Sequence, residues 1–219
     1  MDPHEHWRTV YATKSPEEVS WFEAEPEASL EAMRSLQVKP GSAVVDVGAG
    51  ASRLADALLD IGFSDVTLLD IADSALDTSR ARLGARADQV SWQVADVRHW
   101  RPERRYAVWH DRAVFHFLTE AADREKYRHT LLDATRRGSL ILLATFAPHG
   151  PEQCSGLPVR RYDADGLASE LGDGFALREA WRQLHQTPSG ASQSFQWAVF
   201  ERRPLVRRTP PAGCCPSSA

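Results

Sequence analysis

The stretch Val44-Val45-Asp46-Val47-Gly48-Ala49-Gly50-Ala51-Ser52 joins an apolar run to a turn with two glycines. The apolar run predicts a buried strand, and Ser52–Asp60 predicts a helix after the turn. Gly48 and Gly50 leave no side chain between the backbone and a ligand, and the helix presents free amide groups at its start. The stretch therefore predicts a ligand-binding turn between a strand and a helix.

An acidic residue follows this turn at the spacing that a nucleoside-binding unit requires. Val66-Thr67-Leu68-Leu69 predicts a second strand, and Asp70 ends it about 20 residues after the turn. A carboxylate at that position can accept both hydroxyls of a ribose. A further acidic residue, Asp96, follows the strand predicted at Val90–Val94.

Strand and helix patterns alternate along the rest of the chain. This alternation is typical of an α/β fold with a parallel sheet covered on both faces. The predicted strands are Ala43–Val47, Asp65–Leu69, Val90–Val94, Tyr106–Trp109 and Ser139–Thr145, and the predicted helices are Ser52–Asp60, Ser74–Arg86, Ala121–Arg136 and one from its N-cap Asp163 through Leu171. Phe175–Gln186 and Gln193–Arg202 flank a turn with Pro188 and Gly190, so we expect them to form a closing antiparallel hairpin.

Three motifs resemble those of the Rossmann-like (class I) S-adenosylmethionine-dependent methyltransferases, over roughly residues 5–203. They are Asp46-Val47-Gly48-Ala49-Gly50, Leu69-Asp70-Ile71 and Val94-Ala95-Asp96-Val97. The resemblance implies one seven-stranded sheet in the order 3-2-1-4-5-7-6, with strand 7 antiparallel and helices on both faces.

The same resemblance implies a role for each motif toward S-adenosylmethionine. Asp46, Gly48, Ala49 and Gly50 would hold the amino-acid part of this cofactor. Asp70 and Ile71 would hold the ribose, and Asp96 and Val97 the adenine. Arg53 stands where a dinucleotide-binding turn has its third glycine, which disfavours NAD.

Four polar or ionisable residues follow the strand predicted at Tyr106–Trp109: His110, Asp111, Arg112 and His116. In this fold ligands bind beyond the carboxyl ends of the strands. We therefore expect His110 to contact the cofactor, and Asp111 and His116 to act as catalytic residues that face the transferred methyl group. The alternative is that Asp111 and Arg112 pair and cap the turn, while the histidines are core or surface residues.

Asp111-Arg112-Ala113-Val114 resembles the Asp-Arg-Gly-Ala segment of thiopurine-type methyltransferases. It resembles more loosely the Asp-Lys-Gly segment of lysine methyltransferases, and an Asn/Asp-Pro-Pro-Tyr motif is absent from the sequence. The first resemblance implies methyl transfer to a small-molecule acceptor, a thiol or other soft nucleophile. The second leaves a protein lysine as the alternative acceptor.

The N-terminal segment, residues 1–36, is predicted to be helical and rich in aromatic residues. Trp7 and Tyr11 are four residues apart and share one face of a helix. We expect Trp7 and Trp21 to close the cofactor site as a lid; packing on the sheet surface is the alternative. Residues 37–203 are predicted to form the cofactor-binding domain, and residues 204–219 a disordered tail.

The composition of the chain indicates which classes of partner and which cellular compartment to expect. The net charge of −4, without a basic block outside the tail, disfavours nucleic acid as a partner. No apolar run reaches the roughly 18 residues of a membrane span, and the N-terminus lacks the pattern of a secretory signal. Three cysteines do not form a disulfide framework, which favours the cytoplasm. The spacing of His110, Asp111 and His149 is not typical of a metal site, so we expect none.

Overall fold

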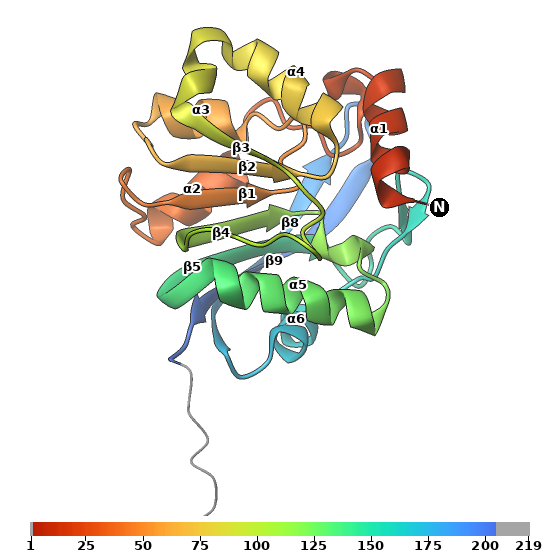
Figure 1. Ribbon diagram of the computed structural model, residues 1–219. Coiled ribbons are helices and arrows are strands. Elements are labelled where there is room, and N and C mark those ends of the chain that lie inside the picture. Colours follow the sequence, from red (N-terminus) through yellow and green to blue (C-terminus); the bar gives the residue numbers. More distant parts are fainter. Residues whose placement is uncertain (1, 205–219) are drawn as a thin grey trace, which may run out of the picture.

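A seven-stranded sheet runs through the centre of the molecule in the order β3-β2-β1-β4-β5-β9-β8 (Figure 1). The computed structural model describes residues 2–204. The strands of this sheet are β1 (Val44–Val47), β2 (Val66–Asp70), β3 (Val90–Val94), β4 (Tyr106–Arg112), β5 (Thr135–Phe146), β8 (Phe175–Gln186) and β9 (Ser192–Arg202). Strands β1 to β5 pair in parallel, and β9 is antiparallel to both β5 and β8. Numbered within this sheet alone, the order is 3-2-1-4-5-7-6, which confirms the prediction.

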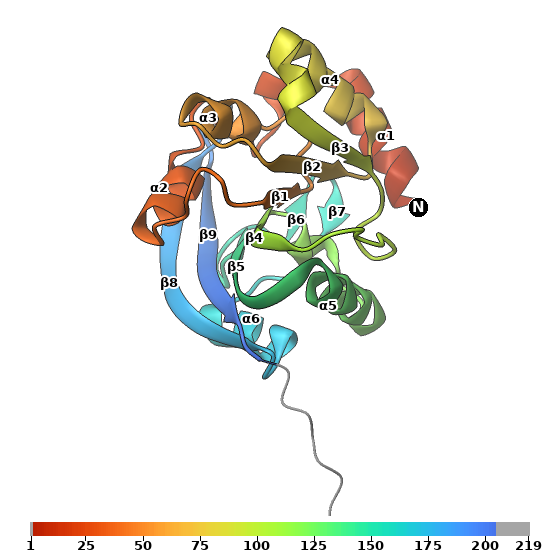
Figure 2. The ribbon, with the colours of Figure 1, turned by 60° about the vertical axis from the view of Figure 1, so that its left-hand side comes forward.

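Helices cover both faces of the sheet (Figure 2). Those on one face are α2 (Glu27–Ser35), α3 (Leu54–Asp60) and α4 (Asp73–Leu83), and those on the other are α5 (Ala121–Ala134) and α6 (Ala164–Leu171). Side chains alternate between the two faces along each strand. In β1, Val44 packs in the core beneath α2 and α3, whereas Val45 and Val47 pack in the core beneath α5 and α6. All of β1 is buried, as expected for a central parallel strand.

The fourth strand is longer than predicted and continues through Arg112. His110 pairs in register with Asp46 of β1, and Asp111 with Val47. A run of three ionisable residues reads as the end of a strand, because charged groups are costly to bury unless they are paired. Here each of the three has a polar partner, so the strand continues into the functional region.

Other predicted boundaries also differ in the structure: β5 begins at Thr135, α5 ends at Ala134 and α3 begins at Leu54. The predicted helix Ser74–Arg86 ends as α4 at Leu83, because Gly84 adopts a φ of +56° and a 3-10 turn over Gly84–Gln89 follows. Residues 27–35, which were predicted only as part of the N-terminal segment, form α2 and pack on the sheet with α3.

The N-terminal helix α1 (Pro3–Thr13) lies apart from these two layers. It packs beside α4, near the carboxyl ends of β1 and β2 (Figures 1 and 2). Among residues 2–204, no helix combines the length and the apolar character that crossing a membrane requires. The predicted tail falls almost wholly outside the described residues.

Candidate functional site

A cavity of about 180 Å³ lies at the carboxyl ends of β1, β2, β3 and β4. This is where ligands bind in open α/β sheets, because the strand order reverses between β1 and β4. Polar residues of its lining include Asp70, Asp96 and Arg98. Aromatic residues of its lining are Trp7, Tyr11, Trp21 and Phe117. The lining of the cavity therefore contains both polar and aromatic side chains.

The glycine turn accepts no larger residue at two positions. Gly48 and Gly50 have φ values of +66° and +50°, which L side chains rarely adopt. A Cβ atom at Gly48 would lie 2.0 Å from Cγ2 of Val114, and one at Gly50 would lie 2.2 Å from the hydroxyl oxygen of Tyr11. The turn is thus in direct contact with both the segment after β4 and the N-terminal helix.

Asp70 is held in place by the turn. Its Oδ2 accepts a hydrogen bond from the Gly50 amide, and its Oδ1 accepts one from the Ala72 amide, each at 2.8 Å. Burial raises the pKa of Asp70 to about 6, although these amides favour the ionised form. Each carboxylate oxygen retains acceptor capacity, and the residue lines the cavity. This donor and acceptor pattern fits a ribose with two free hydroxyls.

Asp96 lies across the cavity and is paired with Arg98. The guanidinium contacts both carboxylate oxygens, with Nη2–Oδ2 at 2.5 Å, and its Nη1 reaches Asp123 at 2.7 Å. Burial opposes ionisation of Asp96, but its hydrogen bonds with Arg98 outweigh this and lower its pKa. Ile71 and Val97 line the same part of the cavity and provide apolar contact for a flat ring.

A second, smaller cavity of about 50 Å³ adjoins the first and shares Gly48, Trp21 and Arg112 with it. Asp46, Ala49 and His110 line this smaller cavity. His110 Nδ1 lies 2.7 Å from Asp46 Oδ1, and its Nε2 lies 2.9 Å from Ser29 Oγ of α2. Ser29 was not identified from the sequence, because only the register of β1 with β4 and the packing of α2 bring the three residues together.

Asp111 points to the opposite face of the sheet from His110, as strand alternation requires. It is fully buried and accepts hydrogen bonds from Tyr127 Oη at 2.6 Å and from the Val114 amide at 2.9 Å. Burial raises the pKa of Asp111 to about 6. It does not line the cavity, which corrects the expectation that it faces the transferred methyl group; it positions the turn after β4 instead.

His116 is also placed away from the cavity lining. It is fully buried between the rings of Phe117 and Phe146, and its Nδ1 accepts the Phe146 amide at 3.3 Å. Burial lowers its pKa to about 3, so the imidazole is neutral at ordinary pH. This position does not support the expected catalytic role, because the ring does not reach the space that an acceptor would occupy.

The aromatic part of the cavity combines α1 with three other segments. The ring of Trp7 lies 5.7 Å from that of Trp21 and 5.1 Å from that of Phe117, edge to face in both cases. The backbone of Trp21 is fixed because Arg112 Nη1 donates to its carbonyl at 2.9 Å, while Nη2 binds Glu23. Trp7 and Trp21 thus line the cavity, as expected, and Tyr11 and Phe117 join them.

A short hairpin completes this part of the cavity. Strands β6 (Gln153–Cys154) and β7 (Leu157–Pro158) are joined by Ser155 and Gly156, both with positive φ. Cys154 and Leu157 line the cavity. Ser-Gly between two short runs is a sequence signal for such a two-residue hairpin. Burial raises the pKa of the Cys154 thiol to about 11, so it is protonated at neutral pH.

Part of the chain matches one family of known proteins, and many solved structures have a similar fold. Residues 44–138 match the family described as a methyltransferase domain. No curated protein matches the chain. A solved structure from work on the conversion of a disulfide bond into a thioacetal group during echinomycin biosynthesis is 20% identical, with 94% of each chain covered and a TM-score of 0.75.

Two further structures are similar over nearly the whole chain. One is an S-adenosylmethionine-dependent methyltransferase from Anabaena variabilis, 17% identical, covering 93% of this chain and 96% of that one, with a TM-score of 0.72. The other is the 1,6-didemethyltoxoflavin-N1-methyltransferase of Burkholderia thailandensis, 18% identical, with 92% and 84% covered and a TM-score of 0.68; it was solved with bound S-adenosylhomocysteine. Residues 44–138 thus match a methyltransferase domain, and the sheet order is the one implied by the resemblance to Rossmann-like S-adenosylmethionine-dependent methyltransferases.

Proposed function

We propose that the enzyme transfers the methyl group to a small molecule through a thiol or another soft nucleophile. The observation that carries this proposal is that one cavity is lined both by Asp70 and Asp96 and by the rings of Trp7, Trp21 and Phe117. Bound S-adenosylmethionine supplies a methyl group that is already activated on its sulfonium. The protein's task is then to align the acceptor and to exclude water.

The residues divide between the parts of the cofactor. Asp70 would accept the ribose hydroxyls, and Asp96 with Val97 and Ile71 would bind the adenine. Asp46 and His110, in the adjoining smaller cavity, would face the amino-acid part, with Gly48 between the two cavities. The ion pair of Arg112 with Glu23 lies beside this part and offers both signs of charge to a zwitterion.

The acceptor would occupy the aromatic part of the cavity. Its lining by Trp7, Phe117, Leu157 and Cys154 favours a flat or apolar molecule. Within the described residues, this lining contains no histidine, and the Cys154 thiol stays protonated. A nucleophile that loses its own proton near neutral pH needs no general base from the protein. This supports a thiol over an amine.

The test is methyl transfer from labelled cofactor to a panel of thiols, set beside a panel of amines and of lysine-containing proteins. The rate with a thiol should rise with pH until the free thiol's pKa, about 8.5 for a cysteine-like thiol, is passed. Methylation of a protein lysine with no activity toward thiols would overturn the proposal and establish the alternative acceptor.

His116→Gln should change the rate with a thiol by much less than the ~10²–10⁴-fold that loss of a general base produces. A glutamine oxygen can still accept the Phe146 amide, so the fold around position 116 should be kept. The measurement is kcat and KM across pH 6 to 9. A loss of two orders of magnitude in kcat, with an unchanged melting temperature, would return His116 to the reaction.

Removal of α1 should weaken cofactor binding while the sheet stays folded. Deleting residues 2–14 removes Trp7 and Tyr11 but keeps Trp21, whose carbonyl binds Arg112. We expect about a tenfold or greater loss of cofactor affinity, because two rings of the cavity wall are lost. Thr9→Ala is the control, since Thr9 is exposed on α1 and its side chain bonds only to the Glu5 carbonyl. Normal turnover by the truncated enzyme would mean that α1 is only a surface element.

A further inference from the structure

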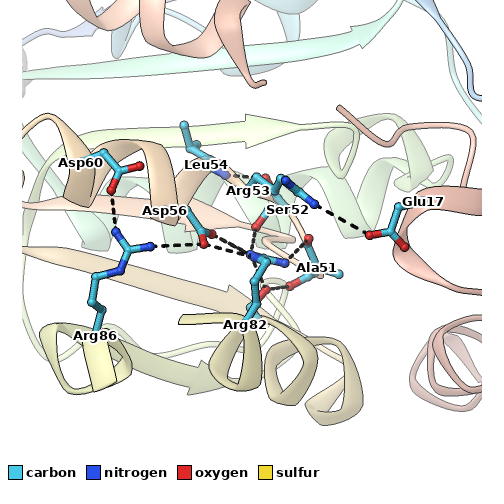
Figure 3. A network of polar contacts seen from close by, with 11 residues as sticks. Glu17, Ala51, Ser52, Arg53, Leu54, Asp56, Asp60, Arg82 and Arg86 are labelled. Carbon is cyan, nitrogen blue, oxygen red and sulfur yellow. Dashed lines mark hydrogen bonds and ion pairs between the residues drawn. The ribbon is translucent and has the colours of Figure 1, made fainter. Parts of the chain in front are cut away.

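Three successive carbonyl groups of the glycine turn are bound by side chains of α4 (Figure 3). Ser79 Oγ donates to the Gly50 carbonyl at 3.0 Å. Arg82 Nη1 donates to the Ala51 carbonyl at 2.9 Å, and its Nη2 donates to the Ser52 carbonyl at 2.6 Å. Ser79 and Arg82 are three residues apart and therefore lie on the same side of the helix.

Asp56 of α3 fixes the orientation of the Arg82 guanidinium. Nε of Arg82 lies 3.2 Å and 3.1 Å from the two carboxylate oxygens, and Nη2 lies 2.8 Å from Oδ2. The two side chains are 23% and 18% exposed, so water competes with this pair only in part. With the guanidinium plane set by Asp56, the remaining N–H groups are directed at the two carbonyls.

These contacts lie directly behind the cofactor site. Gly50 accepts from Ser79 on its carbonyl and donates from its amide to Asp70 Oδ2. In a trans peptide the N–H points opposite to the C=O, so directing three carbonyls toward α4 also fixes the amides that follow them. The orientation of the amides of Ala51, Ser52 and Arg53 is thereby tied to α4. Gly50 links α4 to Asp70 by its two separate contacts, its carbonyl to Ser79 and its amide to Asp70.

We propose that Ser79 and Arg82 are positioning residues for the cofactor, and that with Asp56 they hold the glycine turn in its binding shape. This rests on the assignment of Gly48–Ser52 and Asp70 to the cofactor site. Neither residue lines the cavity. Their effect on binding is indirect. If the turn adopts other conformations as well, the affinity for the cofactor falls in proportion to the fraction of molecules whose turn has the binding conformation.

Lysine cannot replace arginine in this role. An ammonium group retains the charge beside Asp56, but it lacks the planar set of donors that reaches a carboxylate and two carbonyls together. Arg82→Lys should therefore weaken cofactor binding nearly as much as Arg82→Gln, which a purely electrostatic role for Arg82 would not explain. We expect about a tenfold increase in Kd for either variant, and a smaller increase for Ser79→Ala.

Arg86 provides a matched control. It lies in the 3-10 turn after α4 and pairs with Asp60 at 2.5 Å and with Asp56 at 3.7 Å, but it has no bond to a carbonyl of the turn. Arg86→Gln removes one arginine and one contact to the same Asp56. Calorimetric titration with S-adenosylhomocysteine and amide hydrogen exchange over residues 48–54 are the two measurements, with the melting temperature of each variant as a check on folding.

The proposal expects weaker binding and faster exchange of the turn in Arg82→Lys and Ser79→Ala, with both unchanged in Arg86→Gln. An Arg82→Lys variant with wild-type Kd and wild-type exchange would overturn it. Equal loss of binding in Arg86→Gln would also overturn it, because the effect would then follow general stability. If the wild-type protein itself fails to bind the ligand, the assignment of the cofactor site is wrong; exchange of the turn in the variants still shows whether α4 restrains it.

Discussion

Gly48→Val is expected to remove measurable cofactor binding, a loss of at least about 100-fold in affinity. Two physical effects add at this position. The φ of +66° is strained for any β-branched residue, and the new Cβ would lie 2.0 Å from Cγ2 of Val114, at the edge of both cavities. Relief requires the turn or the segment after β4 to move, and either movement changes the wall that the cofactor contacts.

Gly62 serves as a control that separates the effect of backbone strain from the effect of a steric clash. Gly62 has a φ of +89°, but a Cβ atom there meets nothing within 4 Å. Gly62→Val should therefore cost about 1–3 kcal/mol of stability and leave cofactor affinity unchanged. The measurements are calorimetric Kd and thermal unfolding of both variants. Gly48→Val with near wild-type affinity would show that the turn does not contact the cofactor.

Asp70→Ala is expected to weaken cofactor binding by about tenfold or more, since it removes charge-assisted hydrogen bonds to the ribose that contribute roughly 1.5–3 kcal/mol. Asp70→Asn should be no milder. Both carboxylate oxygens accept backbone amides, from Gly50 and Ala72, so an amide nitrogen on the side chain would place one donor against another. The nearly equal volume of asparagine therefore does not preserve the site.

Binding should also depend on pH through Asp70. Its pKa is raised by burial to about 6, above the value of 3.8 for an unperturbed aspartate. The folded protein therefore binds this proton more tightly than the unfolded chain, and ionisation of Asp70 lowers the free energy of unfolding as the pH rises from about 4 through about 6. Ribose hydroxyls stabilise the ionised form. Cofactor affinity should thus fall as the pH drops through about 6.

The measurement is Kd between pH 5 and 8 for the wild type and for Asp70→Asn. The wild-type curve should weaken at low pH, and the variant should lose this component. Asp111→Asn is a control, because the pKa of Asp111 is also raised to about 6 but the residue does not line the cavity. A pH dependence that persists in Asp70→Asn and disappears in Asp111→Asn would exclude Asp70 as its source.

Local patterns in the sequence predicted the strands and the residues of the glycine turn, because apolar runs and glycines have strong local conformational preferences. The order of the strands came from the resemblance to the methyltransferase family. The extent of β4 was not predictable in this way. His110–Arg112 looks like a loop until Asp46, Tyr127 and Glu23 are known to provide partners. Those partners lie far away in the chain, so burial of the three residues is a property of the tertiary structure alone.

The residues of the candidate site likewise divide into those predictable from the sequence and those that only the tertiary structure brings together. Asp70 was identified because it ends an apolar strand about 20 residues after the turn, and Asp96 because it lies in the third motif of the family resemblance. Ser29 and Arg82 were not, since a serine and an arginine on helices resemble many solvent-facing residues. The positions of Asp111 and His116 outside the cavity lining have a related cause. Their place in the sequence is correct for the site, but the alternation of the strand and the packing of aromatic rings turn them into the core.

Ala113 lies between β4 and Val114 with a φ of +75°, in a conformation that costs an L residue roughly 1–2 kcal/mol. A glycine would avoid this strain in the folded state, but it would give the unfolded chain more conformational freedom to lose. The strain in the folded state exceeds this entropic effect, so alanine lowers the stability of the fold here, but it also makes the backbone stiffer than glycine would. By using alanine, the chain narrows the range of backbone angles beside the reacting groups, so this corner of the cavity is preorganised before any ligand arrives.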